Sequence, residues 1–429
     1  MIDDEVLVST DHQGSWGWAG FRLTPVLGLE ATYQYADLSQ EQRAARVADA
    51  EAAWLAAQWT EYRPAAGVHR FELRYRNDPA AGPAALRCAC LCRVRGATRE
   101  AMVEQARRIR DGLAGTLPSH VRAETLGDAV AVRDWLVPFD SPTGPESQVE
   151  LVKRISWQRT VRQDTSRNAT ILVSRLSPRR VSWEPALRQL AALPFPAILT
   201  VGFEPFPRNP SFRAGLEQLA GQYGMLAGAA EGSPLYSVST PPDQFAGYAA
   251  RCYGLYAQKY DGPAFRVRIS LAGQQDLPGP LSAWLANALS GAGVAGTDSG
   301  GASGAVALRP VPHERTLAWT NLATLGANWL GDTYRGPLPD TALGPLEREL
   351  LNLVDREEAS SLVQLPVAWP GHTPLFAGVS AATTQEPDDF GQDQAASWGA
   401  GTRAGEPDAE DPALKYRRPA ANLTGDYDG

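Results

Sequence analysis

The alternation of apolar and polar residues predicts that the chain is built around the stretch 71–115. At its start apolar side chains alternate with Glu72 and Arg74, which is the two-residue period of a half-buried strand. Residues 85–96 are apolar at nearly every position and predict a central strand. Residues 98–113 then place apolar side chains at helical spacing. We therefore expect a strand, a turn, a second strand and an amphipathic helix.

A similar strand-then-helix pattern recurs at 265–291, and a third copy is suggested at 197–224. Two strands with a helix between them in this order resemble half of a ferredoxin-like fold. The pattern thus predicts an α+β protein with tandem ferredoxin-like βαβ halves behind an N-terminal mixed segment. The further expected strands lie at 6–8, 21–29, 121–126, 149–157, 169–176 and 306–308, and a closing strand or extended segment is expected at 359–366. The further expected helices lie at 38–62, 183–193, 248–260 and 343–354.

Changes of composition divide the chain into four expected parts. Residues 1–137 form an N-terminal α+β domain with the first βαβ unit, and the turn-rich residues 138–148 form a linker. Residues 149–379 form a second α+β domain. From residue 380 to 429 ten acidic side chains stand against four basic ones, with few large apolar residues. That composition predicts a disordered acidic tail.

Composition and charge narrow the class of protein. The 429 residues are 44% hydrophobic and 21% charged, which is ordinary for a globular protein. The net charge of −8 comes mostly from the expected tail. The molecule as a whole therefore has no positive charge that would attract nucleic acid. No apolar run is long enough to span a bilayer, and the acidic start does not resemble a secretion signal. We expect a cytoplasmic protein with no membrane partner.

The motifs of common catalytic sites are absent from the sequence. A P-loop needs a lysine directly after glycine, and the lysines Lys153, Lys259 and Lys415 follow valine, glutamine and leucine. Neither H-E-x-x-H nor G-x-S-x-G occurs. We therefore expect no catalytic residue, no cofactor-binding residue and no metal ligand, and predict that the protein is not an enzyme.

A row of three cysteines is the most distinctive local motif. Cys88, Cys90 and Cys92 fall on one side of the expected central strand, where flat strand geometry makes joint binding of one zinc ion awkward. We interpret them as small buried hydrophobic residues. The alternative, a metal site, would need a fourth ligand such as Cys252 or His69, and the spacing favours neither.

The basic stretch between residues 153 and 188 is the candidate interaction face. Its arginines far outnumber its acidic residues, and two tryptophans lie among them. Such a combination could bind nucleic acid through backbone and stacking contacts. The favoured alternative is a solvated sheet face or an interface with an acidic partner. The residues of this face are Arg154, Arg159, Arg162, Arg175, Arg179, Arg180, Arg188, Trp157 and Trp183.

Three segments carry a family resemblance. They are FELRYRNDP with the following ALRCACLCRVRGATREAMVEQARRIRDGL, then VELVKRISWQR with ATILVSRLSPRRVSWEPALRQLAALPFPAILTVGFEP, and finally LVDREEASSLVQLPVAWPGHTPLFAGV. Together, over about residues 68–379, they resemble the N-terminal accessory region of HerA/FtsK-like and type IV secretion-type bacterial ATP-binding proteins. In such proteins similar segments precede the motor. Here the acidic tail stands where the Walker motif would follow, so the resemblance implies the accessory region without the ATPase domain.

The resemblance and the missing phosphate-binding motif together predict a non-enzymatic adaptor or scaffold subunit. It would dock on a separately encoded HerA/FtsK-like motor ATPase, as part of an oligomeric complex. The first alternative is a nucleic-acid-binding subunit that uses the face from Arg154 to Arg188. The second is a structural component of a multi-subunit assembly, and an enzyme on an unfamiliar scaffold is the least favoured interpretation.

Overall fold

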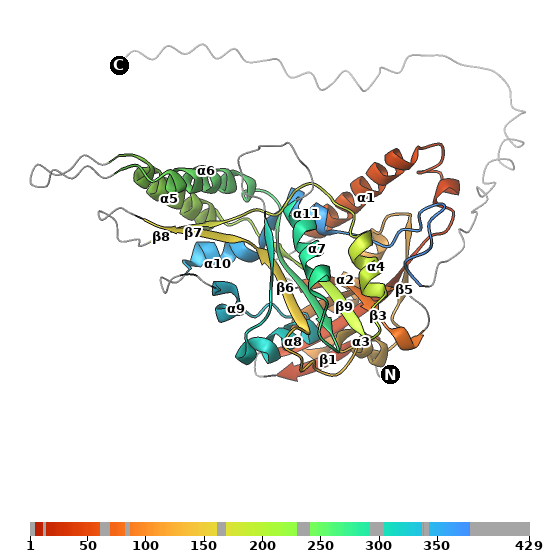
Figure 1. Ribbon diagram of the computed structural model, residues 1–429. Helices are drawn as coiled ribbons and strands as arrows, with labels where there is room; N and C mark the ends of the chain where they lie inside the picture. The colour runs from red at the N-terminus through yellow and green to blue at the C-terminus, as the bar shows by residue number, and fades with distance from the viewer. Residues whose placement is uncertain are drawn as a thin grey trace, which may run out of the picture. The chain divides into compact units, whose positions relative to one another are not determined.

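A single antiparallel sheet of ten strands runs through the computed structural model and carries both halves of the chain (Figure 1). Its strand order is β1-β2-β4-β3-β9-β10-β6-β11, with β5 beside β2 and β12 beside β10. The described residues are 5–11, 14–60, 69–81, 86–160, 169–229, 241–291, 304–336, 338 and 343–377. The tail expected at 380–429 lies outside them. The mixed α+β class predicted from the sequence is confirmed.

The strands of the large sheet are β1 (Leu7–Asp11), β2 (Gly14–Pro25), β3 (His69–Asn77), β4 (Arg87–Gly96), β5 (Val121–Thr125), β6 (Gln148–Lys153), β9 (Ala197–Phe206), β10 (Ala264–Gly273), β11 (Ala305–Leu308) and β12 (Leu353–Asp355). A separate two-stranded sheet consists of β7 (Ile155–Arg159) and β8 (Ala169–Val173). The helices are α1 (Gln40–Thr60), α2 (Arg99–Gly115), α3 (Ala129–Leu136), α4 (Glu184–Ala191), α5 (Pro210–Ala227), α6 (Gln244–Lys259), α7 (Gly279–Ser290), α8 (Arg315–Thr324), α9 (Gly331–Arg335), α10 (Pro345–Asn352) and α11 (Arg356–Leu362).

The same pattern of strand pairing occurs twice. In the first half β2 pairs with β4 and β5, and β3 pairs with β4. In the second half β6 pairs with β10 and β11, and β9 pairs with β10. The two sets meet where β3 pairs with β9, with Phe71 opposite Phe203. The two domains expected at 1–137 and 149–379 therefore contribute to one continuous sheet.

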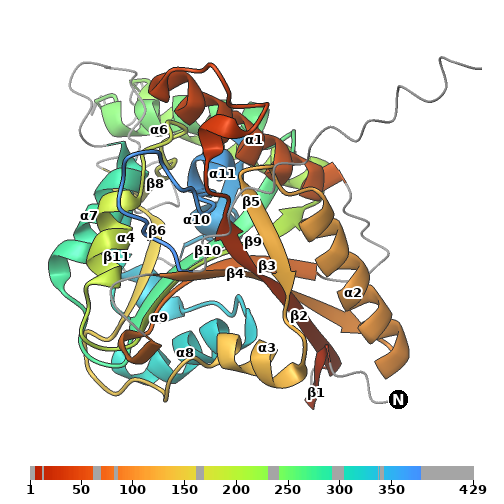
Figure 2. The same cartoon turned by 90° about the vertical axis from the view of Figure 1, so that its right-hand side faces the viewer.

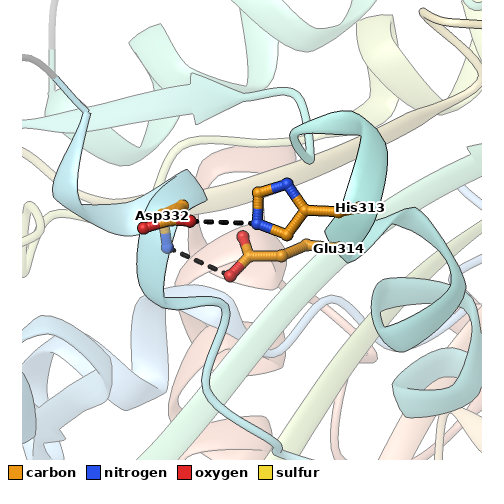
Figure 3. A group of neighbouring side chains, drawn as sticks. All are labelled: His313, Glu314 and Asp332. Carbon is orange, nitrogen blue, oxygen red and sulfur yellow. Dashed lines mark hydrogen bonds and ion pairs between the residues drawn. The ribbon is translucent and has the colours of Figure 1, made fainter.

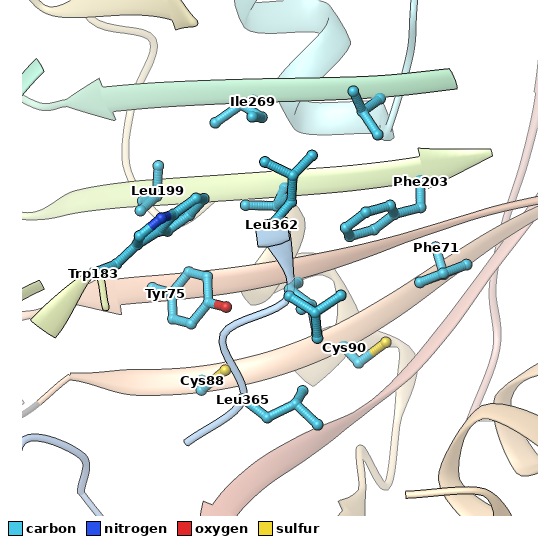
Figure 4. Packing of buried hydrophobic residues seen from close by; sticks show 14 of the residues in the cluster. Phe71, Tyr75, Cys88, Cys90, Trp183, Leu199, Phe203, Ile269, Leu362 and Leu365 are labelled. Carbon is cyan, nitrogen blue, oxygen red and sulfur yellow. The ribbon is translucent and has the colours of Figure 1, made fainter. Parts of the chain in front are cut away.

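The first face of the sheet holds the main apolar core. Side chains from α1, α2, α4, α7 and α11 pack on it. At the junction of the halves the ring of Phe71 stacks on that of Phe203, with 5.3 Å between the ring centroids. Cys88 and Cys90 point into the same layer (Figure 4), and all three thiols of the row on β4 are buried. The prediction that these cysteines are buried hydrophobic residues is thus confirmed.

The segment after β12 closes this core. Leu362 on α11 and Leu365 just beyond it lie over the sheet beside the cysteines (Figure 4). The hydroxyl of Tyr75 on β3 donates to the carbonyl of Gln364 at 2.7 Å. Farther on, Phe376 is buried in the same cluster. Residues 356–377 therefore form part of the packing around β3 and β4, although they are distant in sequence.

The second face of the sheet is covered as well, which corrects the expectation of a half-buried strand at β3. Helices α3 and α8 lie across it (Figure 2), and their apolar side chains form two smaller clusters with β2, β4, β9 and β10. Glu72 and Arg74, expected to face solvent, are fully buried beneath these helices. Alternation identified the strand correctly, but it does not reveal whether the polar face is covered.

Arg74 shows how a charged side chain is accommodated there. Its Nε donates to Oε1 of Glu72 at 2.8 Å. Its Nη1 donates to the carbonyls of Trp135 at 2.5 Å and Leu136 at 3.2 Å, and its Nη2 donates to the carbonyl of Leu322. These carbonyls lie in the last turns of α3 and α8, where the helix dipole favours a cation. Arg74 thus joins both helices to the sheet.

Two expected elements differ in the structure, and three short helices were not expected. The strand expected at 149–157 is interrupted at Arg154, so that β6 belongs to the large sheet and β7 to the small one. The strand or extended segment expected at 359–366 is wrong up to residue 362, because α11 occupies 356–362. Asp355 begins that helix with a capping box closed by Glu358. Helices α3, α8 and α9 were not expected, because each is too short to give a clear helical repeat of apolar residues.

Candidate functional site

The nine residues of the expected interaction face do not form one surface. Trp183 is only 1% exposed and belongs to the main core, so it is unsuited to contact a partner. The guanidinium of Arg175 pairs with the buried carboxylate of Asp355. Arg162 lies outside the described residues. The expectation that Trp183 belongs to an interaction face is therefore corrected. Its place among arginines in the sequence reflects packing in the core.

Two more arginines of the expected face serve contacts within the chain. Nη2 of Arg180 lies 2.5 Å from Oε2 of the buried Glu51 on α1. Arg188 pairs with Glu184 one turn earlier on α4, at 2.6 Å. Arg179 is exposed between these contacts. The second part of the basic stretch therefore acts mainly in holding α1, α4 and α11 together.

The first part of the basic stretch lies on a separate arm. Figure 1 shows the small sheet β7–β8 together with α5 and α6 at one end of the molecule. The tyrosine hydroxyls of these helices bond to one edge of β8. Tyr223 accepts from the amide of Ile171 at 3.1 Å, and Tyr253 donates to the carbonyl of the same residue at 2.9 Å. Tyr256 donates to the carbonyl of Val173 at 2.9 Å.

These contacts fix the direction of the backbone groups of β7. In an antiparallel pair, residues that do not exchange hydrogen bonds with each other direct both backbone groups outward. Ile171 directs its groups toward the tyrosines, and Trp157 is its partner across the ladder. The N–H and C=O of Trp157 therefore point to the outer edge of β7. In the part of the chain that the structure describes, no strand pairs with that edge.

The side chains in the second part of β7 are open to solvent. Trp157 is 36% exposed, and Gln158 and Arg159 are exposed beside it. Arg154 just before the strand is also exposed. Edge strands of this kind are usually protected by charge, by proline or by a covering element. An edge with a tryptophan and flanking arginines is a candidate for pairing with a strand of another protein.

The sequence indicated these residues but could not separate them from their neighbours. The alternation of Trp157 with Arg159 is the signal of an exposed strand face, yet the same stretch continues into arginines that are used internally. What distinguishes the two groups is the set of acidic partners, and these come from α1, β12 and α11.

A buried polar cluster lies between the arm and the main sheet. Lys153, the last residue of β6, donates to the Tyr260 hydroxyl at 2.7 Å and to the carbonyl of Leu353 at 2.6 Å. Its Nζ also lies 2.9 Å from Oε1 of Glu358. Burial lowers the pKa of Lys153, and the charge of Glu358 counteracts this. All donors and acceptors in this cluster are directed at one another, which indicates a structural role.

A histidine and two carboxylates meet near α9 (Figure 3). Nε2 of His313 lies 2.9 Å from Oδ2 of Asp332. The carboxylate of Glu314 accepts from the amides of Asp332 at 3.0 Å and Thr333 at 2.8 Å. Both of its oxygens are therefore occupied at the start of a short helix. This is the one group among the described residues with ligand atoms close enough for a metal ion. The hydrogen bonds among these residues account for their arrangement without a metal ion.

No protein-family model matches the chain, and no curated protein matches it. The structure itself defines the class, a mixed α+β protein with a mostly antiparallel sheet. Among the described residues no helix is both long and apolar enough to cross a membrane.

Proposed function

We propose that the chain is a non-enzymatic adaptor or scaffold subunit that docks on a separately encoded HerA/FtsK-like motor ATPase. The observation that supports this proposal is the outer edge of β7, where no described strand pairs with the backbone of Trp157 and its ring is exposed. Main-chain hydrogen bonds of an added strand provide affinity, and side-chain pockets provide specificity. Because Arg154 and Arg159 flank the edge, the docking segment of the motor is expected to be extended and acidic.

We also propose that the two halves are tandem ferredoxin-like units. In each half the first strand pairs with the third and fourth, and the second strand pairs with the third. That is the pairing of a split βαβ arrangement. A helix follows the first and the third strand of each half, with β7 and β8 inserted before α4, and α5 and α6 inserted before β10. Location in the cytoplasm and membership of an oligomeric complex stay predictions.

The docking proposal is tested by co-purification from the source organism, followed by identification of bound ATPases. The intact chain is compared with a double variant that carries Trp157→Asp and Arg159→Glu. The matched control is Arg213→Glu on α5, whose partners are solvent-exposed. We expect a P-loop ATPase of the HerA/FtsK kind to be retained by the intact chain and the control and lost by the double variant.

Two results would contradict the proposal. One is that no such ATPase is captured, and the other is that the double variant captures it equally well. An ATP-hydrolysis assay on the isolated chain tests the non-enzymatic part separately, because the chain is expected to hydrolyse none.

Nucleic-acid binding stays the alternative function, supported by the exposed Trp157 beside Arg159. It predicts salt-dependent binding of a labelled oligonucleotide, measured by fluorescence anisotropy. The informative variant replaces Trp157 and Arg159 by alanine. Arg180 is unsuitable for this purpose because its loss would leave Glu51 buried without its cation.

A further inference from the structure

A cavity of about 460 Å³ lies on the second face of the sheet, where the two halves meet. Its wall includes Arg70 from β3, Arg266 and Arg268 from β10, and Arg348 from α10. Trp329 and Tyr334 also line the cavity. The cavity is therefore bounded by both halves and is rich in guanidinium groups.

Arg70 is the exceptional residue of this cavity. It is 3% exposed, and its Nε and Nη2 are buried without a hydrogen-bond partner. Four residues farther along the same strand and on the same face, Arg74 has partners for all of its nitrogens. A buried guanidinium that makes no hydrogen bond is costly, because burial removes its hydration and the charges of Glu72 and Glu204 act on Arg70 only from a distance. Unlike Arg74, Arg70 therefore has donors left over that a bound ligand could satisfy.

The space beside Arg70 is created by a glycine. A Cβ added to Gly202 on β9 would lie 2.7 Å from Nη2 of Arg70 and 3.0 Å from Oε2 of Glu72. The guanidinium thus lies across the backbone of β9. No ion pair joins Arg70 to Glu72, and the other oxygen of that carboxylate is bonded to Arg74.

The other arginines differ in how far they are neutralised. Arg268 pairs with the buried Glu150, but its Nη1 is a second buried donor without a partner. Arg266 has two carboxylates, Glu204 at 3.1 Å and Glu349 at 2.5 Å. Arg348 is exposed, and none of the described residues pairs with its side chain. Together with Arg74 and Glu72, five arginines face four glutamates, which leaves one positive charge uncompensated.

We propose that this cavity binds the oxyanion of a small organic phosphate or carboxylate. The planar fork of Arg70 can bind two oxygens of such a group at once, and Nη1 of Arg268 offers a further donor. The rings of Trp329 and Tyr334, in edge-to-face contact with 4.8 Å between their centroids, provide an apolar surface for the rest of the ligand. The proposal is independent of docking at β7.

The test is isothermal titration of the full chain in chloride buffer with three probes, inorganic phosphate, phenyl phosphate and benzoate. We expect phenyl phosphate or benzoate to bind, and the better of the two identifies the class of oxyanion. Arg70→Met is expected to weaken that binding at least tenfold, on the order of the loss of one charge-assisted bidentate contact. Arg348→Ala, an exposed change that does not endanger folding, is expected to weaken it a few-fold. Arg213→Met on α5 is the matched control and is expected to leave it unchanged.

Absence of binding by all three probes would overturn the proposal, because Arg70 would then be paired with Glu72 in solution. Binding that is equal in Arg70→Met, Arg348→Ala and the intact chain would overturn it too. Equal affinity for inorganic phosphate and phenyl phosphate would overturn the assignment of an organic ligand and of the aromatic contact.

Discussion

Nζ of Lys153 lies 2.9 Å from Oε1 of Glu358, and the side chains are 2% and 0% exposed. This ion pair joins the end of β6 to the first turn of α11. The other oxygen of Glu358 accepts from the amide of Asp355 at 2.9 Å, which closes the capping box of the helix. The two residues belong to two of the three segments in which the family resemblance lies. The pair therefore links segments that are far apart in the chain.

Lys153→Met is expected to lower the free energy of unfolding by about 3 kcal/mol, because the buried Glu358 carboxylate would lose its nearest cation and keep only Arg175, whose Nε lies 3.9 Å away. The measurement is urea unfolding followed by tryptophan fluorescence. Lys259→Met is the matched control, since Lys259 pairs with the exposed Glu357 at 2.8 Å. Surface pairs contribute at most about 1 kcal/mol. Similar losses in the two variants would contradict the structural role of the buried pair.

The thiols of Cys88, Cys90 and Cys92 are expected to be unreactive in the folded protein. Burial raises the pKa of Cys92 from 9.0 to about 12, and burial raises the pKa of the other two as well. Since the thiolate is the reactive form, labelling by a thiol reagent at pH 8 should proceed only through unfolding. Rapid labelling of these three residues without denaturant would argue against a sealed core.

The same thiols predict a loss of stability in alkali. Their pKa values are higher in the folded than in the unfolded chain, so the unfolded state binds fewer protons above pH 9. The contribution of Cys92 to stability is fully present below pH 9 and is lost as the pH rises toward 12. The Cys92→Ala variant should show a smaller alkaline loss in urea unfolding. An identical pH dependence in the variant would contradict this assignment.

Tyr253→Phe is expected to destabilise the arm by about 1–3 kcal/mol, because it leaves the Ile171 carbonyl without its donor. Its hydroxyl donates to the buried carbonyl of Ile171. Tyr223→Phe should cost about 1–3 kcal/mol, because it leaves the Ile171 amide without its acceptor. Hydrogen exchange of β7 and β8 gives a local measurement. Tyr33→Phe serves as control, since Tyr33 is 95% exposed, and an effect equal to that of Tyr253→Phe would refute the edge contact.

Arg180→Ala is expected to destabilise the protein by about 2–4 kcal/mol, whereas Arg179→Ala should change stability by less than about 0.5 kcal/mol. The reason is that Arg180 neutralises the buried Glu51, while the side chain of Arg179 is exposed. Thermal unfolding of both variants provides the comparison. Equal midpoints would show that the ion pair between α1 and the segment before α4 is not required.

The pattern of apolar residues predicted the central strands because both faces of β3 and β10 obey a period of two. The same pattern could not show that the charged positions are buried. Arg70 and Arg268 have the sequence context of solvent-facing residues, and their environment depends on α3, α8 and α10, which are distant in the chain. The cavity could therefore not be predicted from the pattern of neighbouring residues in the sequence.

Two other errors have local causes. The apolar run at 359–366 resembles a strand, but the carboxylates of Asp355 and Glu358 satisfy the first amides of a helix. In the segment 149–157 alternation continues through Arg154, where the chain passes from the large sheet to the small one. Period alone does not mark a change of hydrogen-bonding partner. The open edge of β7 is a consequence of that change.

Closure of the core by residues 356–377 has a consequence for biosynthesis. Strand β4 leaves the ribosome about 280 residues before Phe376, which at elongation rates of about 5–20 residues per second corresponds to roughly 15–60 s. During that interval the nascent sheet lacks the apolar cover that Leu362, Leu365 and Phe376 later supply. The growing polypeptide should thus engage holding chaperones until its last buried segment emerges.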